Sequence, residues 1–126
     1  MSWQTYVDAN LIGTNKITGA AIYGHDGGKW ASSAGFELKP EEFKHLISGF
    51  KPNSELFGTG FYLAGVKYFT IKADERSVYG KKESSGCVCV KTGKALIIAL
   101  YDENSTPGEV AKIAENLADY LISVSF

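Results

Sequence analysis

The stretch "KALIIALYDENSTPGEVAKIAENLADYLI", residues 94–122, joins an apolar run to a strongly marked helix. "ALIIAL" is apolar on both faces that a strand presents, which predicts a central strand covered on both sides. Thr106 as N-cap, Pro107 at the first helical position and Glu109 as capping-box partner predict the start of a helix. Apolar residues then recur at helical spacing. A buried strand followed by an amphipathic helix indicates a sheet with helices packed on it.

The other segments extend this pattern in both directions. Trp3, Tyr6 and Val7 lie at helical spacing after Ser2, which predicts a short N-terminal helix that ends at Gly13. The remaining expected elements are a hairpin over 18–34 with a turn at Asp26-Gly27, a helix over 39–50, and strands over 61–73 (bent at Gly65), 77–80, 86–90 and 94–101. We therefore predict an α+β fold in which helices flank an antiparallel sheet and the two terminal helices pack together. The face of the last helix that we expect in solvent carries Lys112, Glu115, Asn116 and Asp119.

Length and composition predict one folded domain over residues 1–126. The chain is too short for two domains of ordinary size, and its 44% hydrophobic against 21% charged residues are typical of a folded protein. No apolar run approaches the roughly 18 residues of a membrane span. The start also lacks the pattern of a secretory signal, so we expect a cytoplasmic protein with reduced cysteines.

The sequence offers no good case for an enzyme. It contains neither a P-loop nor G-x-S-x-G, and His25 and His45 lack the spacing of metal ligands, so we expect no metal and no cofactor. Cys87 and Cys89 are expected as packing residues. A thiol enzyme that pairs one of these cysteines with one of the histidines is the catalytic alternative. Two adjacent carboxylate pairs are expected as solvated charge: Glu41 with Glu42, and Asp74 with Glu75.

Charge is unevenly distributed along the chain. Between Lys67 and Lys94, seven basic residues stand against three acidic ones, so this stretch carries +4 and the rest of the chain carries −5. Such asymmetry predicts a basic surface that faces an acidic protein, an anionic membrane or a nucleic acid. Nucleic acid is the weakest of these partners, because the overall balance is not basic and the aromatics are not interleaved with the lysines.

Large aromatic residues gather near the chain ends, where polar residues are more usual. They are either core residues covering the sheet or the walls of a shallow groove between the terminal helices. Such a groove suits an extended proline-rich ligand, whose bare carbonyls accept hydrogen bonds from indole N–H and phenol O–H groups. The residues concerned are Trp3, Tyr6, Trp30, Tyr120 and Phe126.

Five segments together resemble profilin from end to end. They are "MSWQTYVD" (1–8), "DGGKWASSAGF" (26–36), "FYLAGVKYFTIKADERSVYGKK" (61–82), "GCVCVKTGKALIIALYDE" (86–103) and the helix 106–122. The likeness is greatest to the short profilins of amoeboid protists and extends to plant ones. It implies six or seven antiparallel strands between helices, the terminal pair of helices on one face. It also implies a monomer at the actin cytoskeleton and cell cortex that regulates actin polymerisation.

The resemblance further implies three ligands: monomeric actin in a one-to-one complex, proline-rich proteins such as formins, and phosphatidylinositol 4,5-bisphosphate. The polyproline-binding residues that it implies are Trp3, Tyr6, Trp30, Tyr120 and Phe126. For actin it implies Lys67, Lys72, Tyr79, Lys81, Lys82, Lys91, Glu109, Lys112 and Asn116. For the phosphoinositide it implies Lys72, Arg76, Lys81, Lys82 and Lys91.

Two positions depart from the usual pattern of the family. Asn116 stands where short relatives tend to carry lysine or arginine, which is expected to weaken the actin contact. Glu83 follows "GKK" where glycine is common, and it adds a negative charge beside the basic residues. The alternative function is a peripheral membrane regulator that binds mainly anionic phosphoinositides through the basic face.

Overall fold

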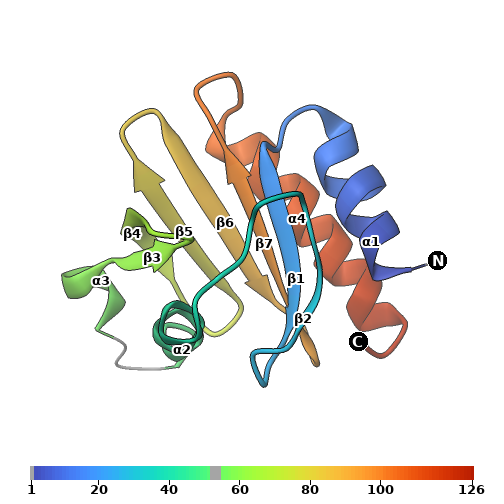
Figure 1. Cartoon of the computed structure of the whole chain (residues 1–126), viewed down its shortest axis with the longest axis horizontal. Coiled ribbons are helices and arrows are strands. Elements are labelled where there is room, and N and C mark those ends of the chain that lie inside the picture. The colour runs from blue at the N-terminus through green and yellow to red at the C-terminus, as the bar shows by residue number, and fades with distance from the viewer. Residues whose placement is uncertain (1, 52–54) are drawn as a thin grey trace.

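Seven strands form one antiparallel sheet in the computed structural model, which describes residues 2–51 and 55–126 (Figure 1). Their order across the sheet is β2-β1-β7-β6-β5-β4-β3, so β1 beside β7 is the one neighbouring pair that is not consecutive in sequence. The strands are β1 (Gly19–Gly24), β2 (Lys29–Ser32), β3 (Phe61–Leu63), β4 (Val66–Ala73), β5 (Ser77–Lys82), β6 (Ser85–Lys91) and β7 (Ala95–Tyr101). This confirms the predicted α+β class with its antiparallel sheet.

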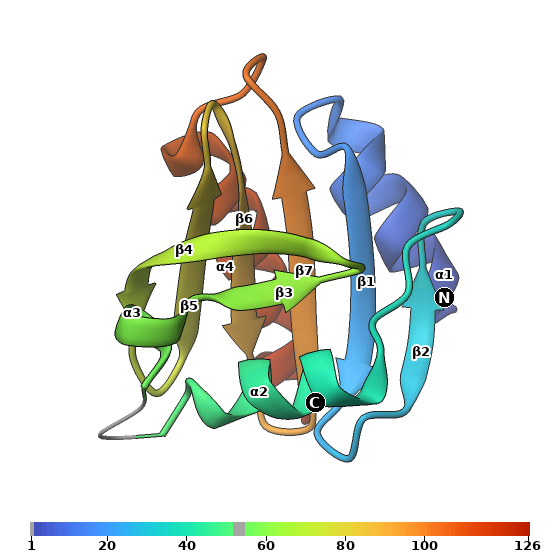
Figure 2. The same cartoon turned by 60° about the vertical axis from the view of Figure 1, so that its left-hand side comes forward.

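Helices cover both faces of the sheet. The N-terminal helix runs through α1 (Trp3–Thr5), η1 (Tyr6–Leu11) and η2 (Ile12–Thr14), and its middle part is π-helical, which the sequence did not predict. It lies beside α4 (Pro107–Ser123) on one face, as predicted (Figure 1). The opposite face carries α2 (Pro40–Ser48) and the short α3 (Leu56–Thr59), and Figure 2 shows α2 in front of the sheet with the terminal helices behind. None of the helices in the described residues has the length and apolarity needed to cross a bilayer.

The prediction that "ALIIAL" is covered on both sides is confirmed by the two cores that meet at β7. Ala95, Ile97 and Ala99 pack into the core under the terminal helices. Leu96 and Ile98 alternate with them and pack into the second core, on the side of α2. Alternation along a strand explains this sorting, because successive side chains point to opposite faces.

The connection between β3 and β4 is a two-residue turn at the predicted bend. Ala64 and Gly65 both take positive φ, 51° and 84°, which is the pattern of a type I′ hairpin turn. The turn also buries a carboxylate. Glu42 accepts hydrogen bonds from the backbone N–H groups of Lys39, Ala64 and Gly65, and the expectation that it is solvated was therefore wrong. Three donors compensate the carboxylate for the water that it loses.

Candidate functional site

The five aromatic residues near the chain ends meet in one place. The ring centroid of Trp3 lies 4.6 Å from that of Trp30 and 4.9 Å from that of Phe126. Trp3 also contacts Tyr6 at 5.6 Å, and Tyr6 continues to Tyr120 at 6.1 Å. We call these five residues the aromatic cluster. It joins three distant segments of the chain, namely the N-terminal helix, β2, and the last turns of α4 with the residues that follow them.

Two local features hold the outer rings of the aromatic cluster in place. Gly24 lies against Trp30, and a Cβ atom there would come within 3.0 Å of the indole nitrogen, so glycine makes room for the ring. Phe126 is fixed through its backbone, since its carbonyl accepts hydrogen bonds from the Thr92 hydroxyl at 2.7 Å and from the N–H of Lys94. The Lys94 ammonium also lies 5.7 Å from the centroid of the Phe126 ring.

The aromatic cluster is only partly covered by the rest of the protein. The exposed fractions are 48% for Tyr120 and 37% for Phe126, and Trp3, Tyr6 and Trp30 are half-buried. Packing in a closed core would leave rings of this size far less accessible. The cluster therefore presents a continuous aromatic surface, with indole N–H and phenol O–H groups at hand for a ligand.

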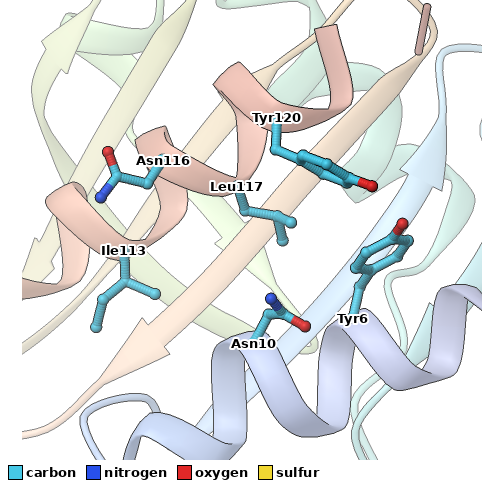
Figure 3. Close-up of a pocket in the computed structure, with 6 residues that line it drawn as sticks. All are labelled: Tyr6, Asn10, Ile113, Asn116, Leu117 and Tyr120. Atoms are coloured by element: carbon cyan, nitrogen blue, oxygen red, sulfur yellow. The ribbon is translucent and has the colours of Figure 1, made fainter. Parts of the chain in front are cut away.

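A groove of about 370 Å³ continues from this surface between the terminal helices (Figure 3). Its lining consists of Tyr6, Asn10, Ile113, Asn116, Leu117 and Tyr120. The hydroxyl groups of Tyr6 and Tyr120 point toward each other, and the Tyr120 hydroxyl raises the pKa of Tyr6. Sequence reasoning missed Asn10 as a lining residue. Its position one helical turn after Tyr6 was the available signal, because side chains at i and i+4 share a helix face.

A second surface lies on the same face of the sheet, where α4 does not cover β4 and β5. Tyr79 points to the side of α4, and Lys81, two residues on, shares its face. Lys72 lies across from Tyr79, with its ammonium 4.9 Å from the ring centroid. Phe69 is paired with Lys81 and is 65% exposed. The ammonium of Lys67 is 5.4 Å from the Phe69 ring centroid. We call these five residues the open strand face.

The open strand face does not include all the residues predicted for actin. Lys82 alternates with Lys81 and therefore points to the opposite face of the sheet. Lys91 also lies on that face, with its ammonium 5.9 Å from the Phe50 ring, which belongs to the core on the side of α2. The sequence missed Phe69, an apolar residue two positions from Lys67, although strand alternation puts the two side by side.

The residues predicted on α4 also divide between two sides of the helix. Glu109 pairs with Lys16, in the loop after the N-terminal helix, at 3.0 Å. Asn116 lines the groove with Tyr6 and Tyr120 and so turns toward the N-terminal helix. Lys112 is exposed on the outward side. The structure thus brings Asn116 closer to the predicted polyproline residues than to the lysines of the open strand face.

Glu115 connects α4 to β5, and the expectation that it lies in solvent was wrong. Its side chain is 24% exposed and accepts hydrogen bonds from Arg76 at 2.8 Å and from Ser77 and Tyr79, both at 2.7 Å. Burial alone would raise the pKa of Glu115, but these three donors lower it below its ordinary value. Burial, with the neighbouring carboxylate, raises the pKa of Tyr79 to about 12.

Arg76, predicted for the phosphoinositide, is engaged by α4. Its guanidinium donates to Glu115 and, at 2.7 Å, to Asp119. Two carboxylates thus offset its charge.

The lysines predicted for the phosphoinositide differ in how they are paired. Lys72 lies 3.7 Å from Asp74. In residues 2–51 and 55–126 no ion pair engages Lys81 or Lys82. Glu83, next to them, takes a positive φ of 54°, which explains why glycine suits this position.

The cysteines and histidines do not form a catalytic arrangement. Cys87 and Cys89 are fully buried, and burial raises the pKa of the Cys87 thiol well above its ordinary value. A catalytic thiol requires a lowered pKa. His25 contacts the carbonyl of Ala95, and His45 contacts Thr59 and the carbonyl of Gly60. Across the described ranges, no group of three or more His, Cys, Asp or Glu residues is arranged to hold a metal ion.

Comparisons with known proteins agree on one family. The profilin family model matches residues 1–126. Profilin-2 of Acanthamoeba castellanii is 54% identical over 126 residues, which is the full length of both chains. The crystal structure of Acanthamoeba castellanii profilin II in a cubic form has a TM-score of 0.95 and covers 99% of this chain and 100% of that one. Mouse profilin IIa, solved in complex with a double repeat from the FH1 domain of mDia1, is 23% identical, with a TM-score of 0.83 and full coverage of both chains, and shares the fold.

The hydrogen bonds to Glu115 predict a pH-dependent contribution to stability. Because the pKa of Glu115 is lowered from 4.5 in the folded chain, its ionised form stabilises the fold above about pH 4.5. This stabilisation is lost as the pH falls through the lower folded-state pKa. We expect Glu115→Gln to reduce the free energy of unfolding by roughly 2 kcal/mol at pH 7, and by much less near pH 3. Urea denaturation at both pH values measures the difference.

Glu103→Gln is the matched control for this prediction. Glu103 is exposed and makes no side-chain hydrogen bond or ion pair within the described part of the chain. Its substitution should change the free energy of unfolding by less than about 0.5 kcal/mol at either pH. An equal loss of stability for Glu115→Gln at pH 7 and pH 3 would contradict the assignment.

Proposed function

This chain belongs to the profilin family of actin-binding regulators, and we propose that it binds one actin monomer while holding a proline-rich segment of a partner protein. It does so as a single domain over residues 1–126. The observation that carries the proposal is the aromatic cluster, in which five rings from three distant segments form one accessible surface. We further propose that it acts in the cytoplasm, at the actin cytoskeleton and cell cortex.

The chemistry of the aromatic cluster suits a polyproline II ligand. Such a ligand is extended before it binds, so little conformational entropy is lost on docking. The proline rings pack against aromatic faces. The ligand's carbonyls have no hydrogen-bond partners within the ligand, so they accept hydrogen bonds from the indole N–H groups of Trp3 and Trp30 and from the hydroxyl of Tyr6. Mouse profilin IIa, which shares the fold of this chain, was solved in complex with an FH1 double repeat. We propose ligands of this kind, as carried by formins, for the aromatic cluster.

The open strand face is our proposal for the actin surface. It combines the cations Lys67, Lys72 and Lys81 with Phe69, an exposed apolar residue of the kind that serves as the anchor of an interface. The lysines complement an acidic protein surface and chiefly raise the association rate. Tyr79 has a different role, since its hydroxyl is held by Glu115 and its ring supports Lys72. Lys112, exposed on α4 three residues before Glu115, is the α4 residue that we propose to add to this surface.

Phosphatidylinositol 4,5-bisphosphate is proposed as a third and weaker ligand. Lys81 and Lys82 at the end of β5 supply its binding charge, but they lie on opposite faces of the strand, and Glu83 offsets part of it. Arg76 contributes little, because Glu115 and Asp119 hold its guanidinium. These contacts favour the actin-binding adaptor over a peripheral membrane regulator.

Intrinsic fluorescence tests the polyproline proposal, since the chain's two tryptophans both lie in the aromatic cluster. Titration with poly-L-proline should give a saturable change. Tyr6→Ala should weaken binding about tenfold, because it removes a ring and a hydroxyl from the middle of the surface. The matched control is Tyr62→Ala on β3, which removes an exposed tyrosine elsewhere and should leave the affinity unchanged. The absence of any change at millimolar proline residues would contradict the proposal.

Charge reversal tests the actin proposal. Lys81→Glu should weaken binding to actin monomers about tenfold at low ionic strength, mainly by slowing association. Lys91→Glu makes the same change of charge on the opposite face of the sheet and should have a much smaller effect. Stopped-flow measurements with labelled actin monomers separate the two rates. Equal losses for both variants would show that net charge, and not the open strand face, governs binding.

A further inference from the structure

A pocket of about 410 Å³ lies between α2 and the hairpin of β1 and β2, on the face of the sheet that Figure 2 shows in front. Its apolar lining includes Leu38, Phe43 and Ile47, and the turn at Gly27 lies against the Phe43 ring. We call it the α2 pocket. None of its described lining residues belongs to the aromatic cluster or to the open strand face. A pocket of this volume, apolar with a few polar groups, is typical of a ligand site.

One wall of the α2 pocket holds a buried hydroxyl with an unused hydrogen. Tyr23 is 3% exposed, and its hydroxyl oxygen accepts a hydrogen bond from the Leu38 N–H at 2.9 Å. Within residues 2–51 and 55–126 this hydroxyl donates to no acceptor. A buried donor without an acceptor is unfavourable, so a ligand acceptor placed there supplies a hydrogen bond that the folded chain lacks.

The two sides of the α2 pocket carry different polar groups. On the hairpin, His25 Nε2 lies 3.1 Å from the Ala95 carbonyl. A carbonyl only accepts, so Nε2 carries the hydrogen of the neutral ring, and Nδ1 is an acceptor that no described donor engages. Asp26, also on the hairpin, accepts from the Gly28 N–H at 2.9 Å. On α2, Lys44 is exposed and forms no ion pair with any described residue.

The apolar C-terminal residue of a protein chain matches this set of groups. Its carboxylate accepts from the Lys44 ammonium and the Tyr23 hydroxyl, and its amide N–H donates to Nδ1 of His25. Its side chain fills the apolar lining. A free amino acid brings an ammonium in place of the amide N–H. The unengaged acceptor of His25 is a neutral nitrogen, and it suits the amide of a chain better than an ammonium.

We propose that the α2 pocket binds the apolar C-terminal residue of a partner protein, with the carboxylate toward Lys44 and the amide N–H toward His25. Capture of a C-terminal carboxylate is a general mode of peptide recognition. The α2 pocket and the terminal helices lie on opposite faces of the sheet (Figure 2). This partner is therefore a third protein ligand, and the proposal does not depend on the ligands of the aromatic cluster and the open strand face.

N-acetyl-L-phenylalanine carries the carboxylate, the amide N–H and the apolar side chain, and it serves as the probe. Titrated into the isotope-labelled full chain, it should shift the NMR signals of residues that line the α2 pocket, with saturation at millimolar concentrations. Its primary amide, which lacks the carboxylate, should bind at least about tenfold more weakly. N-acetylglycine, which lacks the side chain, should be weakened by a similar factor.

Three results of this titration would overturn the proposal. The first is equal binding of the acid and its primary amide, and the second is the absence of saturable shifts around the α2 pocket. The third is tighter binding of free L-phenylalanine than of the N-acetyl form, because the α2 pocket would then be a site for a free amino acid and not for a chain end.

Variants connect the binding to the two donors. Lys44→Gln should remove most of the preference for the acid over its primary amide. The matched control is Lys51→Gln, an exposed lysine just beyond α2 that does not line the pocket, and it should keep the preference in full. Tyr23→Phe removes only a hydroxyl and should weaken the binding of the acid about fivefold. The same spectra show that each variant is folded. A preference for the acid that survives in Lys44→Gln overturns the proposal.

Discussion

The rest of the structure depends on the burial of β7 on both of its faces. Its alanines and Ile97 face the terminal helices, and Leu96 and Ile98 face the core on the side of α2. The small side chains of Ala95 and Ala99 meet a helix that is itself rich in buried alanine, so α4 lies close against the sheet. That position leaves room beside α4 for the N-terminal helix. The aromatic cluster exists because both terminal helices are held on this one face.

Three sides of α4 serve three purposes. One side is buried on the sheet, and a second turns to the N-terminal helix and supplies Asn116 and Tyr120 to the groove. The third turns to β5, where Glu115 accepts from Arg76, Ser77 and Tyr79. The hydrogen bonds on this third side fix α4 relative to the open strand face. The groove and the open strand face are therefore separate surfaces on opposite sides of α4.

Much of this was predictable from the sequence. The capping residues of α4 and the apolar run of β7 fixed the class of fold, and the profilin resemblance identified the five aromatic residues that the structure brings together. Strand alternation alone would have separated Lys81 from Lys82. By contrast, the placement of Glu115 depends on hydrogen bonds from Arg76, Ser77 and Tyr79, more than thirty positions away. The burial of Glu42 depends on a turn more than twenty positions away. Such contacts follow from tertiary packing, which local pattern does not encode.

If each surface holds the ligand proposed for it, the aromatic cluster and the open strand face should accept those ligands independently. The most direct test of this independence is the fluorescence anisotropy of a labelled oligoproline titrated with the free chain and with its one-to-one complex with actin monomer. Because the two surfaces do not overlap, we expect the two affinities for oligoproline to be equal within about twofold. Thermodynamic linkage then requires that oligoproline leave the affinity for actin unchanged within the same factor. Displacement of the oligoproline by actin would contradict it, because one surface would then serve both ligands.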